Sequence, residues 1–124
     1  MNITQAHAYC AALPGATRDI KWENHAVFSV GGKIFAMFTI ENGKPIDQVS
    51  FKTDDARFLE LTDREGFVPA PYLARAKWVK LDGIKRLGKA EAKALLSDAH
   101  RVVMAKLSKT HQRRIMTTDD EGTR

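Results

Sequence analysis

The stretch that decides the fold class is His25–Thr53, HAVFSVGGKIFAMFTIENGKPIDQVSFKT. Its first half contains two runs of strand-forming residues, His25–Val30 and Lys33–Ile40, which are separated only by Gly31 and Gly32. A glycine pair between two such runs is typical of a two-residue hairpin turn, because that turn requires positive φ at both central positions. The pattern therefore predicts an antiparallel hairpin.

The second half of the same stretch adds a third strand. Asn42-Gly43 supplies another turn, and Gln48–Thr53 alternates between polar and apolar residues, with Val49 and Phe51 on one side. Alternation with a period of two is the pattern of a strand that has one face against the core. We expect three consecutive antiparallel strands.

The segments around these strands are expected to be mostly helical. Pro14-Gly15 and Gly66 are stop signals for the first two helices, and Pro69 and Pro71 favour a loop because each lacks a backbone donor. We predict helices over Gln5–Leu13 with Thr4 as N-cap, over Asp55–Glu65 and over Lys89–Lys109, a fourth strand over Ala76–Leu81, and irregular chain over residues 14–24 and 67–71. This order, helix, three strands, helix, strand and long C-terminal helix, indicates an α+β fold in which helices pack against an antiparallel sheet.

Apolar residues at steps of three and four mark the inner faces of the two later helices. On this spacing His100 is expected on the polar face of the last helix. The residues that we expect to be buried are Phe58, Leu59 and Leu61 in the second helix, and Leu95, Leu96, Val102 and Val103 in the last.

Length and composition suit one domain: 124 residues, 44% hydrophobic and 28% charged. We expect a domain of residues 1–116 and a polar, disordered tail of residues 117–124. Cys10 is the single cysteine, which excludes an internal disulfide and fits a reducing cytoplasm. No apolar run approaches about 18 residues, and Met1–Leu13 has no basic start, so neither a membrane span nor a secretory signal is expected. Nothing in the sequence indicates the oligomeric state.

Positive charge is concentrated in one part of the chain. Residues 1–71 carry 7 Lys/Arg and 9 Asp/Glu, whereas residues 72–114 carry 12 Lys/Arg and 3 Asp/Glu, a net charge of +9. Such an asymmetry is typical of a surface that faces a polyanion, although a basic, solvated helix without a partner has the same signature.

The basic part has its centre at Arg75–Leu81. If Val79 and Leu81 face the core, Trp78 and Lys80 face the other way. An exposed tryptophan flanked by cations can stack on a base while the cations neutralise phosphates. Alternatively, Trp78 packs under a helix and the lysines protect an edge strand. The candidate nucleic-acid-binding residues are Arg75, Lys77, Trp78, Lys80, Lys85, Arg86, Lys89 and Arg101.

No pattern indicates catalysis. Gly83–Lys89 has the glycines and the lysine of a phosphate-binding loop, but Ala90 stands where the magnesium-binding hydroxyl belongs. The four histidines include no i, i+4 pair for zinc. Ser97, Asp98 and His100 lie too close together on one helix to act as nucleophile, orienting group and base. We therefore predict no enzymatic activity, no cofactor and no metal site.

Several short motifs together resemble a known family. They are Leu13–Thr17 with Trp22, the hairpin His25–Phe38, Val49–Asp54, and Pro69–Leu73 followed by Lys77–Val79. In this order and spacing they are similar to the MmcQ/YjbR-like proteins over nearly all of residues 1–116. The resemblance implies a CyaY-like, double-wing α+β fold, for which DNA binding has been proposed largely from fold similarity.

Charge and resemblance lead to one leading hypothesis: a small, cytoplasmic, non-enzymatic domain that binds nucleic acid, DNA in particular. Its affinity would come chiefly from phosphate neutralisation by the basic C-terminal third. The alternative is a protein-interaction or small-ligand module that uses the sheet face and the Trp22 loop, with incidental basicity.

Overall fold

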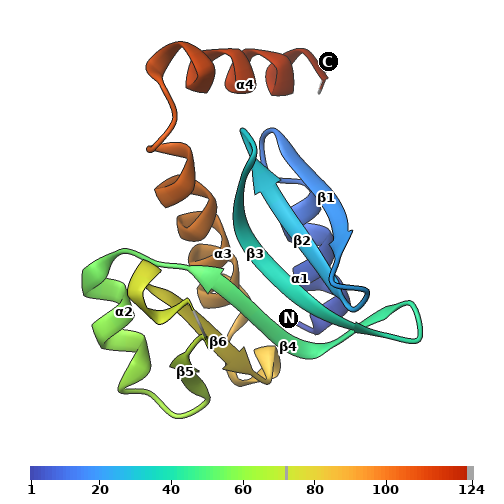
Figure 1. Cartoon of the computed structure of the whole chain (residues 1–124), viewed down its shortest axis with the longest axis vertical. Helices are drawn as coiled ribbons and strands as arrows, with labels where there is room; N and C mark the ends of the chain where they lie inside the picture. The colour runs from blue at the N-terminus through green and yellow to red at the C-terminus, as the bar shows by residue number, and fades with distance from the viewer. Residues whose placement is uncertain (72, 123–124) are drawn as a thin grey trace.

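The computed structural model describes residues 1–71 and 73–122, with side chains described up to Thr117. Figure 1 shows the arrangement of its elements along the chain. In order these are α1 (Ile3–Ala11), β1 (Ala16–Lys21), β2 (His25–Val30), β3 (Lys33–Glu41), β4 (Lys44–Lys52), α2 (Asp55–Thr62), β5 (Phe67–Pro69), the 3-10 turn η1 (Ala74–Ala76), β6 (Trp78–Asp82), the 3-10 turn η2 (Ile84–Arg86), α3 (Lys89–Met104) and α4 (Lys109–Gly122). The α+β class is confirmed, and the elements that the sequence predicts occur in the predicted order.

The strands form one antiparallel sheet in the order β1-β2-β3-β4-β6-β5. Its two central turns are the predicted ones. Gly31 and Gly32 have φ of 57° and 80°, and Asn42 and Gly43 have φ of 52° and 77°. Positive φ at both positions matches the right-handed twist of the strands that each turn joins. The hairpins predicted from these two dipeptides are therefore confirmed.

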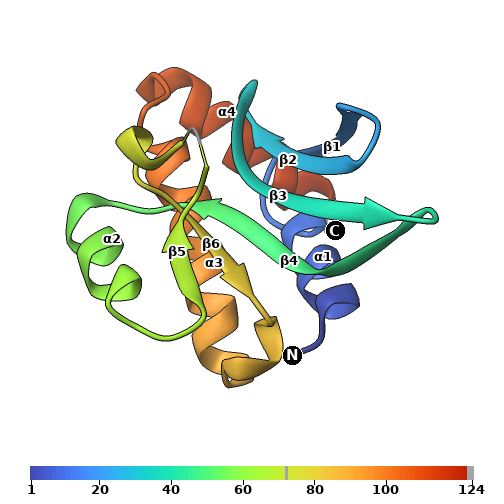
Figure 2. The same ribbon diagram turned by 60° about the horizontal axis from the view of Figure 1, so that its bottom comes forward.

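One face of the sheet carries the hydrophobic core. Helices α1 and α3 lie behind the sheet in the view of Figure 1 and can be followed from a second direction in Figure 2. They pack on the fully buried side chains of Phe28, Phe35, Phe38, Phe51 and Leu81. Because side chains alternate across a strand, the residues between them point away from α1 and α3. We call that opposite side the open face.

The open face contains two rows of paired residues that are relevant to function. Val27, Met37, Ser50 and Lys80 are register partners from β2 across to β6. In the next row, Lys52 of β4 is paired with Trp78 of β6. The predicted alternation of Trp78 and Lys80 against buried Val79 is thus observed.

Two strands were not predicted, and both lie at an edge of the sheet. Residues 17–21 of β1 are exposed on both faces, so this strand lacks the alternation that marks a half-buried strand. Strand β5 has only three residues and includes Pro69, which the sequence assigned to a loop. Proline is tolerated there because an edge strand needs donors on one side only.

The helix boundaries differ from the prediction at several points. Helix α1 begins earlier, because Asn2 rather than Thr4 is its N-cap and accepts a hydrogen bond from the Gln5 amide at 2.8 Å. The single last helix predicted to reach Lys109 is wrong: α3 ends at Met104, and α4 starts where the Ser108 hydroxyl accepts from the His111 amide.

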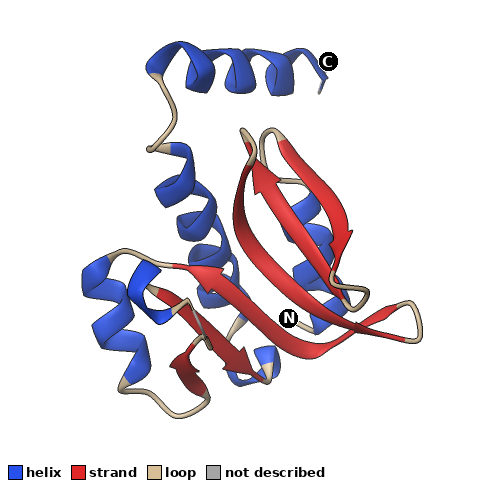
Figure 3. Ribbon diagram, in the orientation of Figure 1, coloured by secondary structure: helices blue, strands red, loops and turns tan. Residues whose placement is uncertain are grey.

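Helix α4 begins beyond the end of α3 and extends over the end of the sheet where β2 and β3 meet (Figure 3). It includes residues 117–122, which the sequence assigned to the tail, while residues 123–124 lie outside the described residues.

Three side chains on these helices also differ from the expectation. Leu59 is 69% exposed, because only Leu61 and Phe58 of α2 turn inward. Val102 is half-buried. His100 is buried instead of solvated, since its Nε2 is 2.7 Å from the Pro14 carbonyl oxygen and its ring meets Phe35 edge-on. The other predicted core residues of α3, Leu95, Leu96 and Val103, are buried as expected.

Candidate binding groove on the open face of the sheet

The chain between β5 and β6 folds over the open face and forms one wall of a groove. The Ala70 amide donates to the Trp78 carbonyl at 3.0 Å, and the Trp78 amide donates to the Leu73 carbonyl at 3.2 Å. The amide and the hydroxyl of Thr53, just after β4, both donate to the Lys77 carbonyl, at 2.9 and 2.7 Å. These bonds fix the wall to the end of β4. Tyr72 lies outside the described residues.

Two adjoining cavities make up the groove. The first, which we call the apolar cavity, has a volume of about 440 Å³, and the second, the polar cavity, of about 300 Å³. They share Met37 and Leu73 as lining residues. The apolar cavity is lined by Trp22, Gly32, Lys33, Ile34, Met37, Lys52, Leu73, Ala76, Trp78, Val103 and Lys106, and the polar cavity by His25, Met37, Thr39, Gln48, Ser50, Ala70, Pro71, Leu73 and Lys80.

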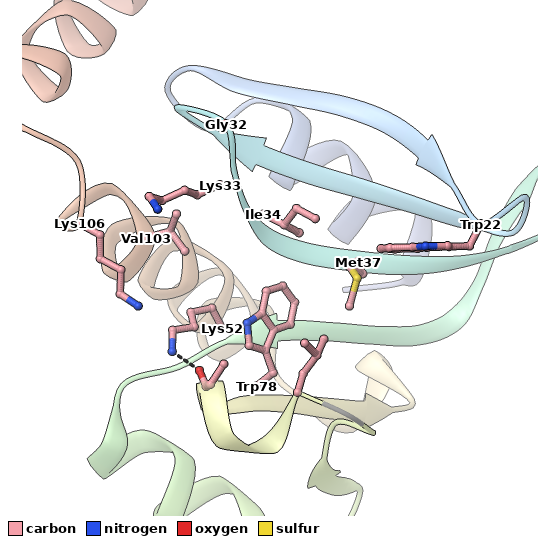
Figure 4. Close-up of a pocket in the computed structure, with 11 residues that line it drawn as sticks. Trp22, Gly32, Lys33, Ile34, Met37, Lys52, Trp78, Val103 and Lys106 are labelled. Carbon is pink, nitrogen blue, oxygen red and sulfur yellow. Dashed lines mark hydrogen bonds between the residues drawn. The ribbon is translucent and has the colours of Figure 1, made fainter.

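Aromatic and charged groups occupy different ends of the apolar cavity (Figure 4). Trp22 lies beside Met37 at one end, and Lys33, Lys52 and Lys106 lie at the other. Trp78 is placed between them and is only 6% exposed. The structure thus decides the alternative left open by the sequence: Trp78 is a packed residue of the cavity and not a displayed stacking platform.

The cationic end has no acidic residue in its lining among the described residues. Lys52 is itself 9% exposed, and its ammonium donates to the Ala76 carbonyl. Burial lowers the pKa of Lys52 below its usual value, and the charges of Lys106 and Lys77 lower it further, while Asp55 partly offsets them. This end of the cavity therefore concentrates positive charge, and no described ion pair neutralises Lys52.

Trp22 is held at the mouth of the cavity by an unusual turn. Trp22 and Glu23 have φ of 53° and 66°, the left-handed region that bulky residues rarely occupy. The Trp22 indole meets the His25 ring edge-on, with 5.9 Å between centroids, and remains 65% exposed. Strained backbone of this kind is concentrated at functional sites. The turn displays a large aromatic surface next to the lysines.

The polar cavity offers hydrogen-bonding groups. Thr39 on β3 and Gln48 and Ser50 on β4 line it, as do His25 and Lys80. The Thr39 hydroxyl is 3.4 Å from Gln48 Oε1. Hydroxyl and amide groups donate and accept hydrogen bonds, so this end of the groove suits a polar part of a ligand.

The structure brings three of the seven predicted basic residues to the groove or its wall. Lys80 lines the polar cavity, and Arg75 is exposed on η1 in the wall. Lys77, next to Trp78, is half-buried with its Nζ 5.1 Å from the Phe58 ring centroid. Of these cations, Lys80 lines the polar cavity and Lys52 the apolar cavity, whereas Arg75 and Lys77 belong to the wall and line neither.

The other predicted basic residues lie elsewhere. Lys85 and Lys89 are exposed near the start of α3, a 16-residue helix about 24 Å long that separates them from Lys106. Arg86 donates from Nε to the Asp82 carbonyl at 2.8 Å and lies 3.9 Å from Glu65. Arg101 is 3.4 Å from Asp98. The charge that is contiguous in sequence is therefore not one surface patch.

Ser97, Asp98 and His100 each have a different partner. The Ser97 hydroxyl is hydrogen-bonded to the Tyr9 hydroxyl at 2.6 Å, and Asp98 is paired with Arg57 and Arg101.

Within residues 1–71 and 73–122, no three His, Cys, Asp or Glu side chains are placed to share a metal ion. In the same part of the chain, no helix has the length and apolar character needed to cross a membrane.

Comparison with known proteins identifies the fold and the family. Residues 11–102 match the YjbR family. A crystal structure of a protein from Pseudomonas syringae, a structural-genomics target, is 23% identical, with a TM-score of 0.65 over 83% of this chain and 99% of the other. At this identity the likeness shows a shared fold. No curated protein matches the sequence significantly.

Proposed function

The chain belongs to the YjbR family, and we propose that it is a non-enzymatic domain that binds nucleic acid, with an unpaired segment lying in the groove. The observation that carries this proposal is the exposed Trp22 indole beside a cavity that has three lysines and no acidic residue among its described lining. Proteins that bind single strands combine cations along the backbone with aromatic groups on which bases stack.

The groove favours a single strand over a duplex. Base stacking on Trp22 requires an unpaired base, and the apolar cavity of about 440 Å³ has room for one nucleotide unit. Phosphates would contact Lys33 and Lys106, which are exposed at the cationic end. This interpretation narrows the proposed site from the basic C-terminal third as a whole to the open face and replaces Trp78 with Trp22 as the stacking residue.

A titration of labelled oligonucleotides tests the proposal. We expect single strands to bind more tightly than the duplex of the same sequence, with log affinity falling linearly against log salt. The substitution Trp22→Ala should weaken single-strand binding by about 1–3 kcal/mol. It should leave the free energy of unfolding unchanged, because the side chain is exposed.

Two charge-matched double variants test the location of the site. Lys33→Ala with Lys106→Ala should reduce the salt slope by roughly 1.4, at about 0.7 for each lost phosphate contact on a single strand. Lys85→Ala with Lys89→Ala removes the same charge at the far end of α3 and should leave the slope unchanged. Equal effects of the two pairs, or no binding tighter than about millimolar at low salt, would refute the proposal.

A further inference from the structure

The apolar cavity has the features of a small-molecule site as well as those of a strand-binding groove. Small-ligand pockets are mostly apolar clefts of about 300–1,000 Å³ with a few polar groups that fix orientation. The apolar cavity has a volume of about 440 Å³ and apolar walls formed by Ile34, Met37, Leu73 and Trp78. Its charged groups are gathered at one end (Figure 4).

We infer that this cavity binds a free small molecule with a planar aromatic body and a phosphate monoester head. The aromatic body would lie between Trp78 and the Trp22–Met37 end, and the phosphate would lie among Lys33, Lys52 and Lys106. The inference goes beyond the proposed function, since it requires no polymer and rests on the geometry of the cavity alone.

Charge complementarity decides the class of ligand. None of the ion pairs among the described residues involves Lys52. An ammonium has three donors, of which the Ala76 carbonyl accepts one. Asp55 is near enough to offset part of the repulsion from the other lysines but forms no ion pair with Lys52, and a buried cation that lacks a contacting anion is unfavourable. Lys33 and Lys106 add two further charges, so a phosphate monoester, which carries −1.5 to −2 at about pH 7, fits this end better than a monoanion.

The aromatic part of the site explains why the ligand needs a ring. Trp78 is packed and presents an apolar surface inside the cavity, whereas Trp22 is held exposed at its mouth by left-handed backbone. Two indoles at different depths favour a flat, polarisable body over a flexible aliphatic chain. At the phosphate end, lysine is a common ligand because its ammonium acts as a point charge and needs no bidentate geometry.

The same arrangement supplies a direct assay. The chain contains two tryptophans, and both line this cavity. Ligand binding should therefore change the intrinsic fluorescence, excited beyond the absorption of the ligand. We would titrate the full chain with adenosine 5′-monophosphate, with adenosine as the probe without a phosphate, and with inorganic phosphate as the probe without a ring. The inference predicts a saturable change with the monophosphate, at concentrations at least tenfold lower than with either partial probe.

A matched pair of variants on strand β4 tests the charge argument. Lys52→Met removes the buried ammonium but retains an unbranched side chain, and we expect it to weaken binding of the monophosphate by about tenfold or more, as for the loss of a charged hydrogen bond. Lys44→Met removes an exposed lysine at the other end of the same strand and should not alter binding. Thermal unfolding of both variants checks that each is folded.

The outcomes separate this inference from the proposed function. Saturable binding of the monophosphate that Lys52→Met weakens supports the small-molecule site, whether or not oligonucleotides bind. Absence of saturable binding into the millimolar range overturns it, even if single strands bind with the predicted salt slope. Equal affinity for inorganic phosphate and the monophosphate, or equal loss in Lys44→Met and Lys52→Met, also overturns it.

Discussion

The turn between β2 and β3 provides a test of how the C-terminal segment is attached to the sheet. A Cβ built on Gly31 would lie 2.5 Å from Leu107 Cδ1 and 3.1 Å from His111 Cε1, both in the chain that follows α3. A Cβ built on Gly32, the next residue, would meet nothing within 4 Å. Both glycines have positive φ, so alanine at either site carries a comparable backbone strain of about 1–2 kcal/mol.

The difference in the free energy of unfolding between Gly31→Ala and Gly32→Ala therefore measures the cost of the clash with Leu107 and His111. Overpacking typically costs about 1–3 kcal/mol, and the low end applies here because the atom met is the end of a half-buried leucine that can shift. We expect Gly31→Ala to lower the free energy of unfolding by about 1 kcal/mol more than Gly32→Ala. Urea unfolding followed by tryptophan fluorescence measures both. Equal losses, or a larger loss for Gly32→Ala, would show that Leu107 and His111 do not pack on the turn.

Three further predictions concern groups that are buried or half-buried. Leu96→Ala should lower the free energy of unfolding by about 2–5 kcal/mol, because Leu96 is 1% exposed under the sheet, and a loss below about 0.5 kcal/mol in urea unfolding would place it on the surface. Burial, and then the charge of Arg18, lower the pKa of His7. Neutral His7 should therefore contribute its full share to the free energy of unfolding above about pH 6.5, and this share should decrease as the pH falls from there toward the pKa of His7 in the folded protein. Urea unfolding across this pH range should show the decrease in the parent chain and not in His7→Gln. Burial raises the pKa of the Cys10 thiol, so iodoacetamide should modify it only at the rate of unfolding, and rapid modification of the folded protein would contradict the buried position.

Most of the fold is predictable because its central part has strong local signals. The Gly31-Gly32 and Asn42-Gly43 turns fix two hairpins, and the alternation of Val49 and Phe51 fixes which side of β4 meets the helices. The edge strands β1 and β5 lack such signals, because one is exposed on both faces and the other is only three residues long. Burial of His100 depends on a carbonyl 86 residues away, which no local pattern reveals.

The candidate site is less predictable because its parts come from separate elements. The charge density along the chain predicts Lys85 and Lys89 as site residues, but the 16-residue helix α3 separates them from Lys106 at the cavity. The cavity instead combines the Trp22 turn, the start of β3, the end of β4, the wall before β6 and the end of α3. Alternation does place Lys52 and Trp78 on the same face, and that signal was available in the sequence. Their burial was not, since it depends on how the chain from Ala70 to Lys77 folds over them.

Lys52 connects the stability of this fold with its proposed ligand. Burial and two neighbouring cations lower its pKa, which means that the folded state resists the charge that the unfolded state accepts freely. The contribution of Lys52 to stability should therefore be lower at neutral pH than above about pH 10.5, where this amine is neutral in both states. Replacement of such a group by methionine is expected to preserve or raise the free energy of unfolding at neutral pH. If Lys52→Met is as stable as the parent chain, the position of Lys52 in the cavity is better explained by an anion that it binds than by a contribution to the fold. A large loss of stability in Lys52→Met would reverse this conclusion, because it would make the hydrogen bond to the Ala76 carbonyl a structural requirement of the groove wall.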